Sequence, residues 1–263
     1  MPQPITAVQR KLIASLRQSR HRRDNGLFVL EGTRSVLDSA AAFKVKWLVA
    51  TDQWLNEYAN QLPDNCRTVL TARNDEMRQM SSVVTPQGVL AVCRIPPTPE
   101  IVDIQHDELI LALDCIQDPG NLGTIMRIAD WFGIKRIIAS PDTVDIYNPK
   151  VINATMGAIA RVGVIYTPLP PILSRAAASG IEIYGTFLEG EPIHSAHLTP
   201  GGIIVMGNEG NGISRPIAAT VTRRITIPSF PKGHPTVESL NVGVATAITV
   251  AEFRTRLLTN GQD

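Results

Sequence analysis

The stretch D-P-G-N-L-G-T-I-M-R, residues 118–127, joins a predicted strand to a predicted helix and indicates an α/β fold. It follows an apolar run at 109–116, which is typical of a buried strand. Apolar residues then recur at intervals of three and four, which predicts a helix with one buried face. These residues are Leu122, Ile125, Met126, Ala129 and Phe132. We expect Asp118 or Asn121 to cap this helix and Gly133 to end it.

Arg127 lies off the predicted apolar face, on the side that it shares with Thr124 and Asp130. Taken alone, the segment favours an ordinary capped helix in which Arg127 and Asp130 form a surface ion pair worth about 0.2–0.5 kcal/mol.

Two later stretches favour a functional interpretation instead. I-I-V-M-G-N-E-G-N-G (203–212) is a short apolar strand followed by a turn with three glycines and one carboxylate. R-I-T-I-P-S-F (224–230) is a second strand, and S-L-N-V-G-V-A-T-A (239–247) opens the last predicted helix. Ligands bind at the edge of an open α/β sheet where the strands end, so we expect a ligand site there.

Together the three stretches resemble the signature motifs of the SpoU-type RNA 2′-O-ribose methyltransferases of the SPOUT superfamily. The resemblance covers the chain from about residue 107 and, more weakly, the first half. It implies methyl transfer from S-adenosylmethionine to a ribose 2′-hydroxyl in structured RNA, either rRNA or tRNA. It also implies a deep trefoil knot in the last third of the domain. Periodicity alone predicts an unknotted sheet, because threaded chains are very rare.

The resemblance also implies the site residues. The catalytic set is Arg127, Asn121, Glu209, Ser239 and Asn241. Arginine is effectively always protonated, so Arg127 is expected to stabilise a developing alkoxide rather than to act as a base. Glu209 is expected to hold Arg127 or Asn241, and Asn121 to orient Arg127 or the ribose. The donor-binding set is Thr186, Phe187, Gly207, Asn208, Gly210, Ile227, Leu240 and Asn241.

The second half is predicted to hold a parallel sheet, because its strands are continuously apolar and alternate with helices. The expected strands are 109–114, 136–140, 164–167, 181–187, 202–206 and 224–228. The expected helices after the first are 148–162, 169–179, 212–221 and 239–258.

The first half alternates short strands with helices and predicts a compact α/β unit. The expected strands are 27–30, 46–50, 67–70 and 88–92, and the expected helices are 33–42, 53–61 and 74–81. F-V-L-E-G (28–32) and T-P-Q-G-V-L-A-V (85–92) resemble the L30-like substrate-binding domain that often precedes a SpoU catalytic domain. I-P-P-T-P-E (95–100) is a linker by its proline content. The predicted domains are therefore 1–97, a linker at 98–106, and 107–263.

Six basic residues precede the first acidic residue, Asp24, and suggest a phosphate-contacting surface. They are Arg10, Lys11, Arg17, Arg20, Arg22 and Arg23. An ordinary solvated helix face explains the pattern equally well. The formal net charge of the 263 residues is +1, so a nucleic-acid site must be a local patch.

Composition predicts a cytoplasmic protein. The three cysteines, Cys66, Cys93 and Cys115, show no C-x-x-C spacing and indicate thiols in a reducing compartment. We find neither a signal-peptide pattern nor an apolar run of membrane-spanning length.

Other interpretations remain. The turn at 207–212 follows a strand, as in nicotinamide-dependent oxidoreductases, but lacks the G-x-G-x-x-G order. A phosphate-loop hydrolase would need G-K-[S/T], which does not occur. A catalytically inactive RNA-binding module is the remaining alternative. His194 and His197 form an H-x-x-H without an evident third ligand, so no metal is expected.

Two further expectations concern loops and assembly. The stretch 229–238 is longer than the usual connection and brings Lys232 and His234 near the site. The resemblance to the family implies a homodimer through the catalytic domain, with the arginine presented across the interface. Two sequence features fit a dimer: the apolar residues of the last helix (Leu240, Val244, Ala247 and Val250) and the small-residue face at 153–160. Both helices simply covering the sheet is an equally good explanation.

Overall fold

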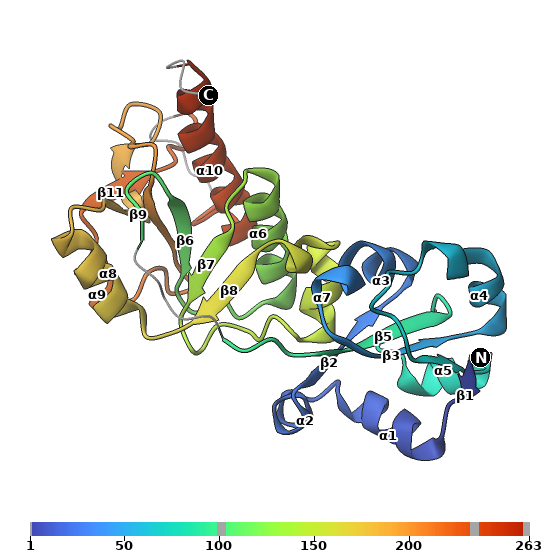
Figure 1. Ribbon diagram of the computed structural model, residues 1–263. Coiled ribbons are helices and arrows are strands. Elements are labelled where there is room, and N and C mark those ends of the chain that lie inside the picture. Colours follow the sequence, from blue (N-terminus) through green and yellow to red (C-terminus); the bar gives the residue numbers. More distant parts are fainter. Residues whose placement is uncertain (1, 99–103, 232–236, 260–263) are drawn as a thin grey trace. The chain divides into compact units, whose positions relative to one another are not determined.

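The structure is a computed structural model that describes residues 2–98, 104–231 and 237–259. Contacts divide the chain into two compact units (Figure 1). Unit 1 comprises Met1–Thr98 and Asp145–Arg161, and unit 2 comprises Pro99–Val144 and Val162–Asp263.

Unit 1 is built on a five-stranded sheet in the order β1-β4-β3-β5-β2. Strand β5 runs antiparallel to both of its neighbours, whereas β1, β4 and β3 run parallel to one another. The strands are β1 (Gln3–Pro4), β2 (Leu27–Glu31), β3 (Val45–Ala50), β4 (Val69–Thr71) and β5 (Val89–Arg94). The helices are α1 (Ala7–Ser15), α2 (Ser19–Asn25), α3 (Thr33–Ser39), α4 (Asp52–Tyr58) and α5 (Asn74–Met80), with short 3₁₀ turns η1 (Ala40–Ala42) and η2 (Ala59–Gln61). The predicted α/β alternation is confirmed.

Residues 145–161 belong to unit 1 by their contacts, although the sequence places them inside the second predicted domain. They form α7 (Pro149–Thr155) and the 3₁₀ turn η3 (Ala158–Ala160), rather than the single predicted helix over 148–162. That prediction is wrong because Met156 and Gly157 both adopt left-handed backbone, with φ of 50° and 93°. A left-handed residue ends a helix. The small-residue face at 153–160 therefore packs within unit 1.

Unit 2 contains a six-stranded sheet in the order β11-β9-β10-β6-β7-β8. All of its strand pairs are parallel, as predicted. The strands are β6 (Leu109–Leu113), β7 (Arg136–Ala139), β8 (Gly163–Tyr166), β9 (Ile183–Pro192), β10 (Gly202–Met206) and β11 (Arg223–Thr226). The helices are α6 (Pro119–Trp131), α8 (Leu169–Ala178), α9 (Arg215–Ala218) and α10 (Val242–Thr259).

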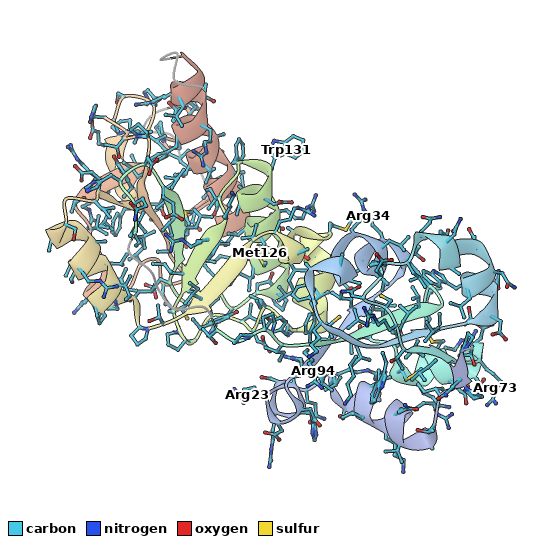
Figure 2. The ribbon with its side chains drawn as sticks, in the orientation of Figure 1. Arg23, Arg34, Arg73, Arg94, Met126 and Trp131 are labelled. Carbon is cyan, nitrogen blue, oxygen red and sulfur yellow. The ribbon has the colours of Figure 1, made fainter. Side chains whose placement is uncertain are left out.

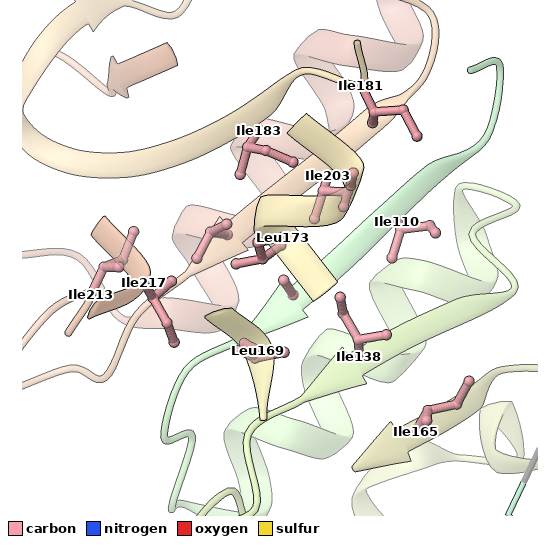
Figure 3. Close-up of a cluster of buried hydrophobic side chains, with 13 residues drawn as sticks. Ile110, Ile138, Ile165, Leu169, Leu173, Ile181, Ile183, Ile203, Ile213 and Ile217 are labelled. Carbon is pink, nitrogen blue, oxygen red and sulfur yellow. The ribbon is translucent and has the colours of Figure 1, made fainter. Parts of the chain in front are cut away.

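Helices cover this sheet because its strands are apolar on both faces. Figure 3 shows the buried cluster beneath α8 and α9. In it, Leu169, Leu173 and Ile217 of these helices pack against apolar side chains of the sheet. These sheet residues are Ile110, Ala112, Ile138, Ile165, Ile183, Ile203 and Val205. Helix α6 packs beside α10 and buries four of the five predicted apolar residues, whereas Phe132 is half-buried at the C-cap. Two predicted helices are shorter in the structure: 212–221 is reduced to α9, and 239–258 begins at Val242.

Strand β9 carries a bulge that the sequence did not predict. Arg224 of β11 pairs with Gly185, but the next residue, Ile225, pairs with Glu191. The backbone pairing with β11 therefore skips residues 186–190, of which the Leu188 carbonyl accepts the Thr226 hydroxyl of β11 at 3.0 Å. None of the helices in the described part of the chain is long and apolar enough to cross a membrane.

Candidate active site

The site lies where parallel strands end at one edge of the unit 2 sheet. Strands β9, β10 and β6 are neighbours; Gly207 follows β10, Asp114 follows β6, and Thr186 is the first residue of β9 beyond its pairing with β10. The loop that follows β11 leads to Asn241 and α10. The three sequence motifs are thus brought to the predicted edge.

The side chains of Asn121, Glu209 and Asn241 form a closed hydrogen-bonded cycle. The Asn241 amide nitrogen donates to Oδ1 of Asn121 at 2.9 Å and to Oε1 of Glu209 at 3.0 Å. The Asn121 amide nitrogen donates to the same Glu209 oxygen. Each of the three comes from a different motif, so this cycle joins all three. Of the two partners predicted for Glu209, the structure shows Asn241 and not Arg127.

Helix caps position two members of the cycle. Asp118 Oδ1 accepts the backbone N–H of Asn121 at 2.8 Å, which caps α6 as one of the two predicted residues. Asn241 Oδ1 accepts the N–H groups of Gly243 and Val244 at 3.0 and 3.3 Å, which satisfies donors at the start of α10. Gly133, with φ of 69°, follows the end of α6 as predicted.

Asn208 fastens the glycine-rich turn to the end of β6. Its amide nitrogen donates to the carbonyl of Cys115 at 2.8 Å, and its Oδ1 accepts the N–H groups of Gly210 and Asn211. The polar atoms of this side chain are therefore engaged inside the protein. Asn208 was predicted to bind the methyl donor, and any such contact would have to come from its backbone.

Two glycines of this turn differ in what surrounds them. A Cβ on Gly207 would lie 2.3 Å from the carbonyl carbon of Gly212, closer than backbone atoms allow. A Cβ on Gly210 would meet only the Asn208 Oδ1, at an ordinary 3.6 Å. Gly207 is thus required by the packing of the turn, whereas Gly210 is not.

The segment after β6 makes polar contacts that the sequence analysis did not predict. Cys115 adopts φ of 57°, and its N–H donates to the Ser140 hydroxyl at 2.8 Å. Burial, and then a hydrogen bond with Asp142, raise the pKa of the Cys115 thiol to about 11. Asp114 Oδ2 accepts the N–H of Ser214 at 2.7 Å, which links β6 to the end of the glycine-rich loop.

Arg127 is exposed on α6 and, within the described ranges, forms no hydrogen bond or ion pair. The surface pair with Asp130 is therefore not formed, and Asn121 does not contact Arg127 in this structure. Four residues further along α6, Trp131 is 85% exposed, and Figure 2 shows it pointing away from unit 2. The guanidinium is free to bind a ligand.

The predicted donor-binding residues surround the same edge. Thr186 and Phe187 lie in the β9 bulge, where the Thr186 hydroxyl donates to the Val205 carbonyl at 3.0 Å. The Arg224 guanidinium lies 3.5 Å from the centre of the Phe187 ring. Ile227 is half-buried and Leu240 is 43% exposed, on the loop that follows β11. Ser239 is exposed.

Several other predicted residues lie apart from this cycle. His194 and His197 are exposed, and the described residues contain no group of three potential metal ligands. Lys232 and His234 lie outside the described residues.

The six N-terminal basic residues are not alike. Arg22 is buried and bonds Asp145 at 2.6 Å as well as the carbonyls of Leu16 and Arg17. The structure does not support Arg22 as a phosphate contact. Arg10 pairs with Glu76, and Arg20 with Asp24 at 3.7 Å. Arg17 donates to the carbonyls of Gln79 and Ser81. Lys11 and Arg23 are exposed without a partner among the described residues.

The fold and the site define an α/β protein with a parallel sheet and a ligand edge built by three loops. Residues 108–251 match the SpoU rRNA Methylase family, and residues 9–91 match the MRM3-like substrate binding domain. The chain therefore belongs to the SpoU rRNA methylase family.

Relatives cover nearly the whole chain. The 23S rRNA (guanosine(2553)-2′-O)-methyltransferase RlmP of Bacillus subtilis is 27% identical, over 91% of this chain and 93% of the relative. An uncharacterized tRNA/rRNA methyltransferase of Synechocystis is 30% identical, over 95% and 93%.

Solved structures agree with this. A protein of Porphyromonas gingivalis assigned to the TrmH family of RNA methyltransferases has a TM-score of 0.86 and 37% identity, over 96% of this chain and 99% of that one. An AdoMet-bound rRNA methyltransferase of Sinorhizobium meliloti has a TM-score of 0.84 and 27% identity, over 97% of each chain.

Proposed function

We propose that the protein transfers a methyl group from S-adenosylmethionine to a ribose 2′-hydroxyl of ribosomal RNA. The observation that carries this proposal is the cycle of Asn121, Glu209 and Asn241, which joins the three motif loops of the SpoU family at the ligand edge. Transfer RNA is the second candidate substrate, because one relative carries a tRNA/rRNA name.

The residues present at the edge fit an adenosine-containing donor. Leu240 and Ile227 offer apolar contact, and Leu240 is 43% exposed. The β9 bulge takes residues 186–190 out of the backbone ladder with β11. Apart from the Leu188 carbonyl, which accepts the Thr226 hydroxyl, its backbone groups suit hydrogen bonding to a ribose or an adenine edge. When bound, S-adenosylmethionine supplies an electrophilic methyl group on a sulfonium.

Arg127 is proposed to act on the acceptor ribose. Its guanidinium stays protonated, so it hydrogen-bonds the 2′-oxygen and stabilises the negative charge that develops there. Its planar fork also fits the adjacent phosphate in a bidentate way. The cycle keeps Asn121 and Asn241 in fixed orientations, which lowers the entropy lost when the ribose binds.

The alternative of an inactive RNA-binding module does not explain why the cycle joins all three motif loops or why Arg127 is exposed without a partner in the described residues. A nicotinamide cofactor is also disfavoured, because the 207–212 turn leads to the four-residue helix α9 rather than to a long phosphate-binding helix.

We further propose a homodimer that shares its active sites. Trp131 is 85% exposed on α6, and Val244 and Ile248 are 49% and 39% exposed on the neighbouring α10. Such apolar exposure on a packed helix pair is typical of an interface. Val250 is buried and takes no part. Arg127 lies one helical turn from Trp131, so a dimer through this surface would bring it near a partner's edge. The trefoil knot and the cytoplasmic location remain predictions.

A mixing experiment tests the shared site. Inactive Arg127→Ala chains are combined, after mild dissociation, with Gly207→Leu chains whose donor loop is blocked. If arginine and donor come from different subunits, half of the dimers carry one intact site, and activity returns to about a quarter of wild type. If each site lies within one chain, mixing restores nothing.

The reaction itself is tested with radiolabelled S-adenosylmethionine and ribosomal RNA from a strain that lacks the gene. Incorporation at a ribose 2′-position, mapped in RNA with and without the gene, supports the proposal. Incorporation into transfer RNA alone would move the substrate to the second candidate, and no incorporation into either would overturn the proposal.

A further inference from the structure

The charges of the chain are separated between its two units, although the whole sequence has a net charge of only +1. Unit 1 contains 15 Lys and Arg against 9 Asp and Glu, a net charge of +6. Unit 2 contains 10 against 15, a net charge of −5. An anionic partner is therefore attracted to unit 1. The exposed, unpaired cations of unit 1 indicate which of its surfaces binds that partner.

The N-terminal helices α1 and α2 do not supply most of that attraction. Arg10, Arg20 and Arg22 are paired with Glu76, Asp24 and Asp145. A cation that already has a carboxylate partner gains less from a phosphate, because the existing pair must be broken first.

Seven cations of unit 1 are exposed and form no ion pair or side-chain hydrogen bond within its described ranges. Three of them, Lys11, Arg78 and Lys150, lie on helices α1, α5 and α7. The other four are Arg23, Lys44, Arg67 and Arg94, which we call the basic edge. Figure 2 labels Arg23 and Arg94, which lie at the same end of unit 1.

Sheet register places Arg67, Lys44 and Arg94 along one border of the sheet, and Arg23 precedes the end of β2 that lies at this border. The Arg94 N–H donates to the carbonyl of Lys44 at 2.9 Å, and Arg94 pairs with Leu27 on its other side. Arg67 lies just before β4. The carbonyl of the next residue, Thr68, accepts the N–H of Leu48 on β3 at 2.9 Å. Arg23 stands in the last turn of α2, just before β2. The order along the border is Arg67, Lys44, Arg94, Arg23.

The row has the dimensions of a nucleic-acid contact. From β4 to β2 it crosses three strand spacings of about 4.8 Å each, a length of about 14 Å. One nucleic-acid strand carries about one phosphate per 3.4 Å of helix axis, so the row faces about four phosphates. On β3, Lys46 lies over the ring of the half-buried Trp47 at 4.3 Å and adds a fifth positive charge nearby.

We propose that the basic edge binds the sugar-phosphate backbone of the RNA substrate. This inference rests on the proposed function, because it assumes that RNA is the acceptor. It places the main phosphate contacts at the border of the unit 1 sheet rather than on α1. Of the six N-terminal basic residues predicted to contact phosphate, only Arg23 belongs to the basic edge.

Two charge-matched triple variants test it. The first, R23Q/K44Q/R94Q, removes three cations of the basic edge. The control, R20Q/R34Q/R73Q, removes three exposed arginines of the same unit that are paired with Asp24, Asp38 and Asp75. Both variants lower the net charge by three, so any difference between them reflects position and not total charge.

Binding of deproteinised ribosomal RNA is measured from 50 to 300 mM salt, with donor affinity and thermal unfolding as folding checks. We expect the first variant to lower the slope of log K against log salt by about 2–3. We expect the control to lower it by less than about 1, with donor affinity unchanged in both. Equal slopes for the two variants, or a larger change in the control, would overturn the basic edge and leave the methyltransferase proposal standing. If wild type binds no ribosomal RNA at any salt concentration, the basic-edge proposal fails, and the incorporation assay decides the methyltransferase proposal separately.

Discussion

The side-chain amide of Asn241 donates a hydrogen bond to the side-chain oxygen of Asn121 at 2.9 Å, across 120 residues of sequence. Glu209 accepts from both amides, so each asparagine has a single orientation that uses all of these contacts. The cycle ties the starts of α6 and α10 to the loop after β10. Its effect is to hold three loops in one arrangement before any ligand binds.

Asn241 both caps α10 and donates hydrogen bonds to Asn121 and Glu209, and two variants separate these roles. Asn241→Ala removes the cap of α10 and the cycle, so we expect a loss of about 1 kcal/mol of stability together with weaker donor binding. Asn241→Asp keeps a cap acceptor but cannot donate, and it places a second carboxylate beside Glu209. We expect it to retain the stability and lose the donor affinity, as measured by denaturant unfolding and calorimetry. Equal donor affinity in wild type and Asn241→Asp would remove the cycle from the donor site.

Arg127→Ala should reduce turnover by at least about 100-fold, because it removes the charge that stabilises the developing alkoxide. Donor affinity should stay nearly unchanged. Arg127→Lys should not restore activity, since lysine lacks the planar fork. Arg175→Ala, which removes an exposed arginine of α8, is the matched control. Turnover is measured with radiolabelled donor, and a similar loss in both variants would point to general RNA attraction instead.

Gly207→Ala should disrupt the glycine-rich turn, because the new Cβ would lie 2.3 Å from backbone of Gly212. Gly210→Ala meets no backbone atom and should be tolerated. We expect the first variant to lose donor binding and thermal stability, and the second to keep both within about 1 kcal/mol. Thermal unfolding with and without donor measures this, and a tolerated Gly207→Ala would contradict the packing of the turn.

Arg22→Ala should destabilise unit 1 by about 3 kcal/mol, since it leaves buried carbonyls and Asp145 without their partner. The value lies at the low end of the range because Asp145 is 33% exposed. Arg20→Ala, whose pair is exposed on both sides, should leave the stability unchanged. Denaturant unfolding compares the two, and equal stabilities would show that the buried pair contributes nothing.

Cys93 should make the protein less stable at alkaline pH. Burial, and to a lesser extent Cys66, raise the pKa of its thiol from 9.0 to about 12. Between these values the unfolded chain releases the proton while the folded chain keeps it, so the free energy of unfolding falls as pH rises above 9. The loss from this group should be about 1.4 kcal/mol at pH 10. Between pH 8 and pH 10, the free energy of unfolding should fall less in Cys93→Ala than in wild type, because the variant lacks this thiol. Each protein is compared with itself at the two pH values, so the effect of the substitution on packing cancels.

Local pattern determined the regular elements. The Asp118 cap, the buried positions of α6 and the Gly133 after its end follow from side-chain period and backbone preference, which act within a few residues. The continuous apolar strands likewise predicted the parallel sheet of unit 2. The motifs placed Asn121, Glu209 and Asn241 at one edge, because parallel strands end together.

Only the tertiary structure decided which groups are partners. Arg10 and Arg22 looked unopposed in sequence, yet Glu76 and Asp145 lie 66 and 123 residues further along and neutralise them in space. The same holds for the β9 bulge, for the attachment of Asn208 to Cys115, and for residues 145–161, which pack in unit 1. Hydrogen bonds and ion pairs act over about 3–4 Å, whereas sequence pattern reports only the next few residues, so contacts between distant segments depend on how the strands are ordered.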